Sequence, residues 1–198
     1  MRVFWLLLPI LLFTACGDET LPIPKPRSYP RVYYPERAYE TFTTEYCNFQ
    51  FAAPKSATFV REELFFDRVP PDSCWFDLRL DPALNGAIHF SYYPLNSYED
   101  FENIRDEAFE LAGVHNKFAS TIEEVAIHRD DAGVHGIAFD IAGPAASPFQ
   151  FFLTDSTNNF VRGALYFDAE VNPDSLAPVI DYVKEDIFKI VETFEWSR

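Results

Sequence analysis

The stretch "PFQFFLTDSTNNFVRGALYF", residues 148–167, decides the fold of this chain. Two strongly apolar segments, 148–153 and 160–167, flank the polar turn "TDSTNN". Asp, Asn, Ser and Thr favour turns because their side chains hydrogen-bond nearby backbone groups. Two apolar runs of strand length on either side of such a turn predict a pair of antiparallel β-strands.

Alternation of apolar and polar residues extends this sheet to other parts of the chain. It runs through residues 47–51, 74–80 and 88–92. The period of two predicts half-buried strands, each with one face on a core. Residues 125–127 and 134–142 flank the turn "DDAG", which predicts a further hairpin.

Two segments have the helical period instead. A capping-box pattern begins at Ser97 and an apolar stripe follows it, so we expect a helix over residues 97–118. A long apolar stripe over residues 176–194 predicts a second helix, capped by Asp174 or Ser175.

The order of these elements, strands, helix, strands, helix, defines the expected fold class. It predicts a single α+β domain over residues 45–198, a mainly antiparallel sheet flanked by two long helices. No internal repeat and no Gly-rich turn between a strand and a helix appears, which argues against a parallel nucleotide-binding architecture.

Residues 1–15 have the pattern of a secretory signal peptide, with a positive charge, an apolar run and small residues before Cys16. The apolar run is too short to span a hydrocarbon core of about 30 Å. A cysteine at the cleavage point resembles the lipobox of bacterial lipoproteins, although Phe13 stands where Leu is usual. We therefore expect lipidation of Cys16 and a mature chain held at a membrane. The alternative is an ordinary signal peptide that contains a cysteine.

Residues 16–44 are interpreted as a lipidated, Pro-rich tether. The stretch "LPIPKPRSYPRVYYPERAYETF" contains five prolines, which favour extended geometry and do not build the interior of a sheet. Lys25, Arg27, Arg31 and Arg37 make it locally basic. It is either a spacer with some packing on itself or a docking strip whose Tyr and Arg side chains hold a partner.

The charge of the chain excludes one class of partner. The formal net charge is -15, and removal of Arg2 with the signal peptide makes it -16. Nucleic acid and anionic lipid surfaces repel such an acidic body, so we expect no nucleic-acid partner and no membrane contact beyond the anchor. Paired carboxylates such as Glu185-Asp186 are expected on solvated faces.

Cys47 and Cys74 remain after the lipidation site. An exported protein meets an oxidising compartment, so these two cysteines are candidates for a disulfide. The bond would close a loop of 27 positions (74 minus 47) and stabilise the fold by about 3–4 kcal/mol.

No sequence motif of an enzyme is present. The chain has no GxSxG, SxxK or HExxH pattern and no CxxC pair. His128 and His135 flank the "DDAG" turn, and solvated hairpin residues explain this pattern without a metal. Ser147 or Ser156 serves a hydrolase only if a histidine and an acid converge on it. We therefore expect no catalytic residue, no cofactor and no metal site.

The "TDSTNN" turn also suggests a docking patch. Arg162 lies just beyond it and adds five fixed donors and a permanent charge to a group of hydroxyls and amides. Such an arginine is suited to holding a carboxylate or backbone carbonyls of a partner. We hypothesise that Asp155, Thr157, Asn159 and Arg162 form this patch, with a purely structural turn as the alternative.

Several segments together carry a resemblance to a known family. They are "PKPRSYPR", "CWFDL", "GAIHFSY", "AASPFQFFLTDSTNNFVRGALYF" and "NPDSLAPVIDYVKEDI". In this order they resemble the gliding motility-associated lipoprotein GldD family over about residues 16–196, with residues 143–167 as the most distinctive block. The order of sheet and helices is also similar to that of PsbP-like domains, which are binding modules.

The resemblance implies a function through partners. It implies an accessory lipoprotein of the gliding machinery and the linked type IX secretion system, whose other components are the expected partners. The chain is expected to face the periplasm, and the sequence leaves open which membrane holds the anchor. One alternative is a small-molecule or glycan-binding module with Trp75, Tyr93 and Tyr98 near a groove. A second alternative is a serine hydrolase.

Overall fold

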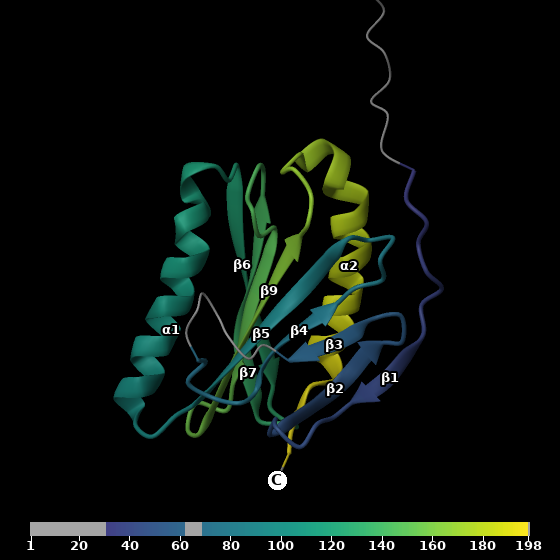
Figure 1. Ribbon diagram of the computed structural model, residues 1–198. Helices are drawn as coiled ribbons and strands as arrows, with labels where there is room; N and C mark the ends of the chain where they lie inside the picture. The colour runs from purple at the N-terminus through teal and green to yellow at the C-terminus, as the bar shows by residue number, and fades with distance from the viewer. Residues whose placement is uncertain (1–30, 62–68, 198) are drawn as a thin grey trace, which may run out of the picture.

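The computed structural model describes residues 31–61 and 69–197, so the predicted signal peptide and Cys16 lie outside the described residues. Two α-helices, one 3₁₀-helix and ten strands follow one another along this part of the chain (Figure 1). In order they are β1 (Tyr39–Phe42), β2 (Phe49–Pro54), β3 (Thr58–Arg61), β4 (Trp75–Arg79), β5 (Gly86–Pro94), α1 (Tyr98–Gly113), η1 (Val114–Lys117), β6 (Thr121–Arg129), β7 (Val134–Ala142), β8 (Phe149–Thr154), β9 (Asn159–Phe167), α2 (Pro173–Thr193) and β10 (Glu195–Trp196).

The described strands form two antiparallel sheets. The larger sheet has seven strands in the order β3-β4-β5-β9-β8-β7-β6, and the smaller has the order β1-β2-β10. The hairpin predicted from residues 148–167 is confirmed: β8 and β9 pair from Phe149 opposite Leu165 to Thr154 opposite Phe160. The predicted hairpin around "DDAG" is β6 and β7. The α+β fold class is therefore confirmed.

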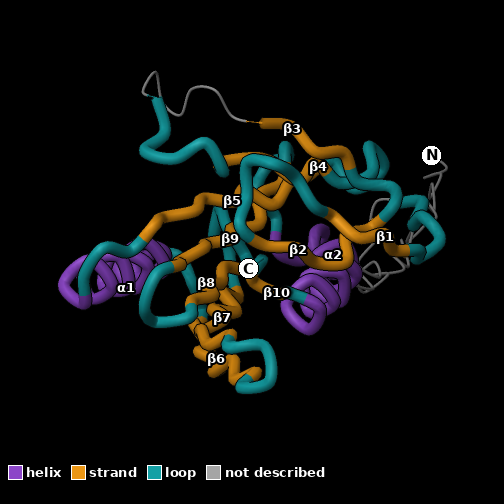
Figure 2. Tube along the Cα trace, turned by 90° about the horizontal axis from the view of Figure 1, so that it is seen from below, coloured by secondary structure: helices purple, strands orange, loops and turns teal. Residues whose placement is uncertain are grey.

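The two helices cover opposite faces of the larger sheet (Figure 2). On one face, α1 packs over a cluster that includes Phe139, Phe152 and Phe160. On the other face, α2 and the smaller sheet enclose a larger cluster that includes Phe151 and Ile187. The molecule thus has two cores, one on each side of the larger sheet.

This arrangement corrects the prediction of half-buried strands. Every residue of β8 is buried, because its alternate side chains enter the two different cores. On β4, Trp75 and Asp77 alternate with the apolar Phe76 and Leu78, so a period of two places them on the outer face, yet their exposed fractions are 9% and 0%. Periodicity identifies two faces of a strand but does not show that both are covered.

A glycine allows the centre of the larger sheet to pack closely. A Cβ atom on Gly163 of β9 would lie 2.3 Å from the ring of Phe151 on β8. Glycine is therefore required at this point of "FVRGALYF" so that the ring of Phe151 can approach the backbone of the neighbouring strand.

The predicted N-terminal cap is confirmed for α1 but not for α2. Ser97 caps α1 as predicted and accepts a hydrogen bond of 3.1 Å from the backbone N–H of Asp100. The predicted cap of α2 at Asp174 or Ser175 is wrong, because the side chain of Asn172 caps this helix. Pro173 at the first helical position explains the earlier start, since proline needs no hydrogen-bond acceptor for its nitrogen.

The predicted boundary between tether and domain at residue 44 also needs correction. Residues 31–44, named here the N-terminal arm, contain β1, which pairs with β2 over four residues. In Figure 1 the arm runs down beside α2 before it enters the smaller sheet. The spacer is therefore shorter than the sequence predicts, because the second half of the Pro-rich segment belongs to the domain.

Candidate functional site

The turn between β8 and β9 is closed by the carboxylate of Asp155. Its Oδ1 accepts hydrogen bonds from the backbone N–H groups of Thr157 at 2.9 Å, Asn158 at 2.8 Å and Asn159 at 2.9 Å. Burial opposes ionisation of Asp155, but these hydrogen bonds outweigh it and hold the pKa of the carboxyl below its ordinary value. Ser156 adopts a positive φ of 64°, which the ring of bonds around it stabilises.

Asn159 links this turn to the neighbouring strand. Its side-chain amide donates to Oδ2 of Asp155 at 2.6 Å, and its Oδ1 accepts the hydroxyl of Tyr92 on β5 at 2.6 Å. Thr154 donates to the backbone carbonyl of Asn159, also at 2.6 Å. The side chains of Asp155 and Asn159 therefore bond within the fold, as the structural alternative of the docking hypothesis expects.

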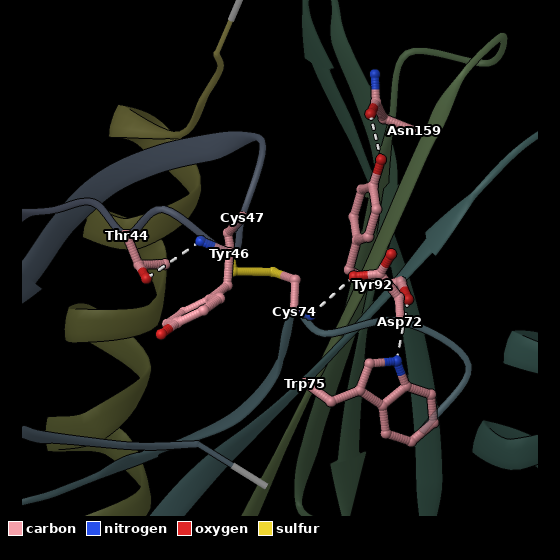
Figure 3. The surroundings of a disulfide bond; sticks show 8 residues. All are labelled: Thr44, Tyr46, Cys47, Asp72, Cys74, Trp75, Tyr92 and Asn159. Atoms are coloured by element: carbon pink, nitrogen blue, oxygen red, sulfur yellow. Dashed lines mark hydrogen bonds between the residues drawn. A yellow bond between two sulfur atoms is a disulfide. The ribbon is translucent and has the colours of Figure 1, made fainter. Parts of the chain in front are cut away.

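A disulfide lies at the same end of the molecule (Figure 3). Cys47, which precedes β2, and Cys74, which precedes β4, form the bond that the sequence predicts, with their Cα atoms 5.0 Å apart. The backbone N–H of Cys74 donates to Asp72 at 2.7 Å, and the indole of Trp75 donates to the carbonyl of Tyr92 at 3.0 Å. Because Tyr92 also bonds the turn, the disulfide and the turn belong to one bonded network.

Arg162 does not join the turn residues in a patch. Its side chain is on the face of β9 that α1 covers, where Nη1 lies 3.8 Å from a carboxylate oxygen of Glu107. Only 19% of the Arg162 side chain is exposed. The structure therefore does not assemble Asp155, Thr157, Asn159 and Arg162 as one exposed group, because the pleat directs Arg162 toward the helix.

The N-terminal arm holds α2 through a cluster of polar and aromatic side chains. Arg37 donates to the carbonyl of Tyr182 at 3.0 Å, forms an ion pair with Glu185, and lies with its guanidinium carbon 4.3 Å from the centre of the Tyr182 ring. The hydroxyl of Tyr182 donates back to the carbonyl of Pro35 at 2.7 Å. Arg37, one of the side chains that suggested a docking strip, therefore binds a helix of its own chain.

Tyr39 and Asp186 form the buried centre of this contact. The hydroxyl of Tyr39 donates to Oδ1 of Asp186 at 2.7 Å, and Asp186 is 3% exposed. Burial raises the pKa of Asp186, although Tyr39 and Arg37 partly oppose this shift. Burial and the adjacent carboxylate raise the pKa of Tyr39 to about 12. The expectation that Glu185-Asp186 marks a solvated face is wrong for Asp186.

A second buried carboxylate lies on β4. Asp77 contacts Nδ1 of His89 on β5, and its other oxygen lies 2.8 Å from Nη2 of Arg79. Neither oxygen of Asp77 has a well-aligned hydrogen bond with a described residue. Periodicity does not find this group, because Asp77 and His89 alternate with apolar residues and a period of two places both on the outer face of their strands. Asp77 and His89 lie directly opposite each other on β4 and β5. Once the register of these strands is known, an acid opposite a base predicts such a contact.

The aromatic residues of the small-molecule alternative are not gathered around one groove. Trp75 is buried and stacks edge-on against Tyr93, with ring centres 5.5 Å apart. Tyr98 is 66% exposed at the start of α1. A hollow of about 320 Å³ lies elsewhere, between β1 and β3, and Phe42 and Phe59 are among its lining residues.

The residues considered for catalysis and metal binding also lie apart. Ser147 is fully buried and donates to the carbonyl of Phe149 at 3.4 Å, while Ser156 is in the turn. The rings of His128 and His135 are 6.1 Å apart on the β6–β7 hairpin. Within residues 31–61 and 69–197, no group of three His, Cys, Asp or Glu side chains is placed to hold a metal ion.

Comparison with known proteins decides the family. The sequence matches the family described as gliding motility lipoprotein GldD over residues 19–196. The chain belongs to this family. Membership in a lipoprotein family implies attachment to a membrane through a lipid, and none of the helices in the described part of the chain has the length and apolar character needed to cross a bilayer. No curated protein sequence matches the chain.

The fold is similar to that of a solved structure from another group of proteins. The solution structure of cyanobacterial PsbP (CyanoP) from Synechocystis sp. PCC 6803 superposes with a TM-score of 0.50 at 9% sequence identity. The match covers 81% of this chain and 93% of that chain. The predicted PsbP-like fold of this GldD-family chain is therefore confirmed, and an identity this low shows the fold alone.

Proposed function

We propose that this chain is a periplasm-facing accessory component of the gliding machinery and of type IX protein secretion, and that it acts through protein–protein contacts. The observation that carries the proposal is its membership in the gliding motility lipoprotein GldD family over residues 19–196. Acyl groups on Cys16 hold the protein at the membrane, and the folded body binds other components of the machinery. The proposal assigns no catalytic step to the chain.

The N-terminal arm supports this proposal because it determines how the folded domain is oriented relative to its lipid anchor. In Figure 1 the N-terminal arm begins at the upper end of the molecule, opposite the end of the sheet that carries the turn between β8 and β9. The fifteen positions from Cys16 to Arg31 (31 minus 16) would span about 45 Å in polyproline II geometry. The contacts of Arg37 and Tyr39 with α2 hold the arm in this position. The end of the domain that carries the β8–β9 turn and the disulfide therefore points away from the residue where the tether joins the domain.

Deletion and complementation in the native bacterium test the proposal. We expect a deletion strain to lose both colony spreading and the release of type IX cargo into the medium, and the wild-type gene to restore both. Spreading and cargo release are scored separately. Normal cargo release in a strain that cannot glide would remove the secretion role, and normal gliding would remove the proposal as a whole.

The hollow between β1 and β3 favours a second candidate function, a small-molecule or glycan-binding module. Its volume of about 320 Å³ is at the lower end of the range for ligand sites. Phe42 and Phe59 supply apolar walls, and Thr43 and Glu40 supply polar groups. Titration of the purified protein with cell-wall and membrane-derived fragments tests this function. Binding that Phe59→Ala abolishes would support it, and the absence of binding at millimolar ligand would exclude it.

A further inference from the structure

The seven-stranded sheet ends in a long free strand, β6. In the described part of the chain β6 pairs with β7 on one side and with no strand on the other. The strand has nine residues, whereas β3 at the opposite edge has four. Figure 2 shows β6 projecting beyond both α1 and α2. A free edge of this length presents a row of unpaired backbone N–H and C=O groups.

The side chains of β6 give this edge only part of the usual protection. Natural edge strands are commonly shielded by lysine and other charges, by proline or by great shortness; β6 has nine residues with no lysine and no proline, and its shielding charges are those of Glu123 and Glu124. Val125 is 47% exposed, and Ala126 next to it is also exposed. The acidic side chains at the centre of the strand, Glu123 and Glu124, form no ion pair with any described residue.

The sequence of β6 complements itself in one antiparallel register. Two copies of an edge strand pair only through residues whose backbone groups point outward, so opposed residues are both even-numbered or both odd-numbered. The two-fold axis therefore passes through a residue. With the axis at Ala126, Glu123 lies opposite Arg129 of the second copy, and Glu124 lies opposite its His128. Each acid meets a basic residue, and the symmetry makes every contact twice.

The central pair in this register is apolar. Val125 of one copy lies opposite Ile127 of the other, on the face that α2 covers. Arg129 is already held on that face, since its Nη1 donates to the carbonyl oxygens of Val191 and Phe194. These bonds use one of its three nitrogens, and a guanidinium has five N–H donors.

Neighbouring registers lack this complementarity. With the axis at Val125, Glu123 lies opposite Ile127 and Glu124 lies opposite Ala126, which leaves both acids without a cation. An axis at Ile127 instead opposes Glu124 to another carboxylate, that of Asp130. Like charges at directly opposite positions destabilise a strand pair. Among these registers, only the axis at Ala126 places a basic residue opposite each of the two glutamates.

We propose that β6 is the interface of a homodimer in which two copies pair antiparallel about Ala126 and join their sheets into one. A second copy fits the edge better than an unrelated strand, because the charges of β6 match their own reversed order. The dimer does not depend on the secretion role, and either can fail without the other.

Disulfide trapping with the full-length, lipidated protein in native membranes tests both the pairing and its register. Opposed Cα atoms in an antiparallel pair lie about 4.5–5.5 Å apart, which suits a disulfide. Ala126→Cys is therefore expected to give a reducible dimer band under mild oxidation. Glu124→Cys is the matched control, because its two copies lie about 13 Å apart along the strand. Mixed Glu124→Cys and His128→Cys proteins are expected to cross-link to each other.

A dimer band confined to Ala126→Cys and to the mixed pair supports the proposal. Bands of equal strength from Ala126→Cys and Glu124→Cys overturn the register, and no band from any variant overturns the dimer. In that last case the two glutamates act as protection of the edge or the edge accepts a different protein.

Charge reversal gives a second, independent readout. We expect the detergent-solubilised wild type to sediment as a dimer and the Glu123→Lys/Glu124→Lys variant to sediment as a monomer with an unchanged thermal melt. Glu45→Lys/Glu110→Lys makes the same change in net charge at exposed positions away from β6 and is expected to remain a dimer. Equal loss of the dimer in both double variants would show a general charge effect and overturn the proposed interface.

Discussion

The hydroxyl of Tyr39 on β1 donates a hydrogen bond of 2.7 Å to Oδ1 of Asp186 on α2. These residues are 147 positions apart, and their contact fastens the N-terminal arm to the last helix. The carboxylate of Asp186 is almost completely buried, and Nε of Arg37 lies 3.8 Å from its Oδ1. The arm is therefore held by a buried charge that is costly to desolvate, which gives its stability a dependence on pH.

The first prediction concerns Asp186→Asn. Burial raises the folded-state pKa of Asp186 above its unfolded value of about 3.9, so the wild type loses stability as pH rises from about 4 through the raised pKa. Asparagine does not titrate, and its carbonyl still accepts the Tyr39 hydroxyl. We expect the stability of the variant relative to the wild type to increase between pH 4 and pH 7, measured by urea unfolding. Asp181→Asn on the exposed side of α2 is the control; identical pH profiles for wild type and Asp186→Asn would contradict the expectation.

The second prediction concerns the bond between Cys47 and Cys74. Its loop of 27 residues makes the disulfide worth about 3–4 kcal/mol on the chain-entropy model. We expect the Cys47→Ser/Cys74→Ser variant to lose this amount in urea unfolding. Wild-type protein treated with reductant should unfold like the variant. Two alkylatable thiols in the folded, non-reduced wild type would show that the bond does not form.

The third prediction concerns Asp155, which accepts three backbone N–H groups in the turn. Asp155→Ala leaves these donors without their acceptor, and we expect a loss of about 2 kcal/mol in the free energy of unfolding. The depressed pKa of Asp155 means that its contribution is present above about pH 4 and is lost as pH falls through the folded-state pKa. Thr157→Ala, in the same turn, should change stability little. If both variants melt alike at pH 7, the turn does not depend on the carboxylate.

The fourth prediction separates docking from helix packing at Arg162. Its contact with Glu107 is a partly exposed ion pair, so Arg162→Ala and Glu107→Ala should each cost less than about 1 kcal/mol. Since the arginine lies against α1, we expect both variants to restore gliding equally in a deletion strain. A loss of gliding with Arg162→Ala alone, at normal stability, would reinstate this residue as a contact for a partner.

The fifth prediction concerns Cys16, which lies outside the described residues. The chain belongs to a lipoprotein family, and because the "FTAC" pattern resembles a lipobox we expect this cysteine to accept the lipid. Labelling cells with a palmitate analogue should mark the wild type, and Cys16→Ala should remain unlabelled and be unprocessed or released. Equal label in both proteins would remove the lipidation site from Cys16.

Local patterns in the sequence account for most of the elements. The apolar runs of residues 148–167 and their polar turn predict the β8–β9 hairpin, and Ser97 marks the start of α1 at its observed residue. The pairing of Cys47 with Cys74 follows from the export signal and the lack of any other candidate. These features depend on residues close in the chain or on a count, so no knowledge of the packing is needed to predict them.

The candidate site depended on contacts that no local pattern contains. Only the tertiary structure decided that Asp77 is buried, that Asp186 receives the N-terminal arm and that Arg162 faces α1. A period of two or of 3.6 shows that an element has two unlike faces, but the burial of each face depends on which distant element packs against it. The sequence by itself therefore determined the long strands, the two helices and the likeness to a lipoprotein family, but not the short strands β1, β3 and β10. The packing of two helices on opposite faces of one sheet decided which charges are enclosed and which strand edge stays free.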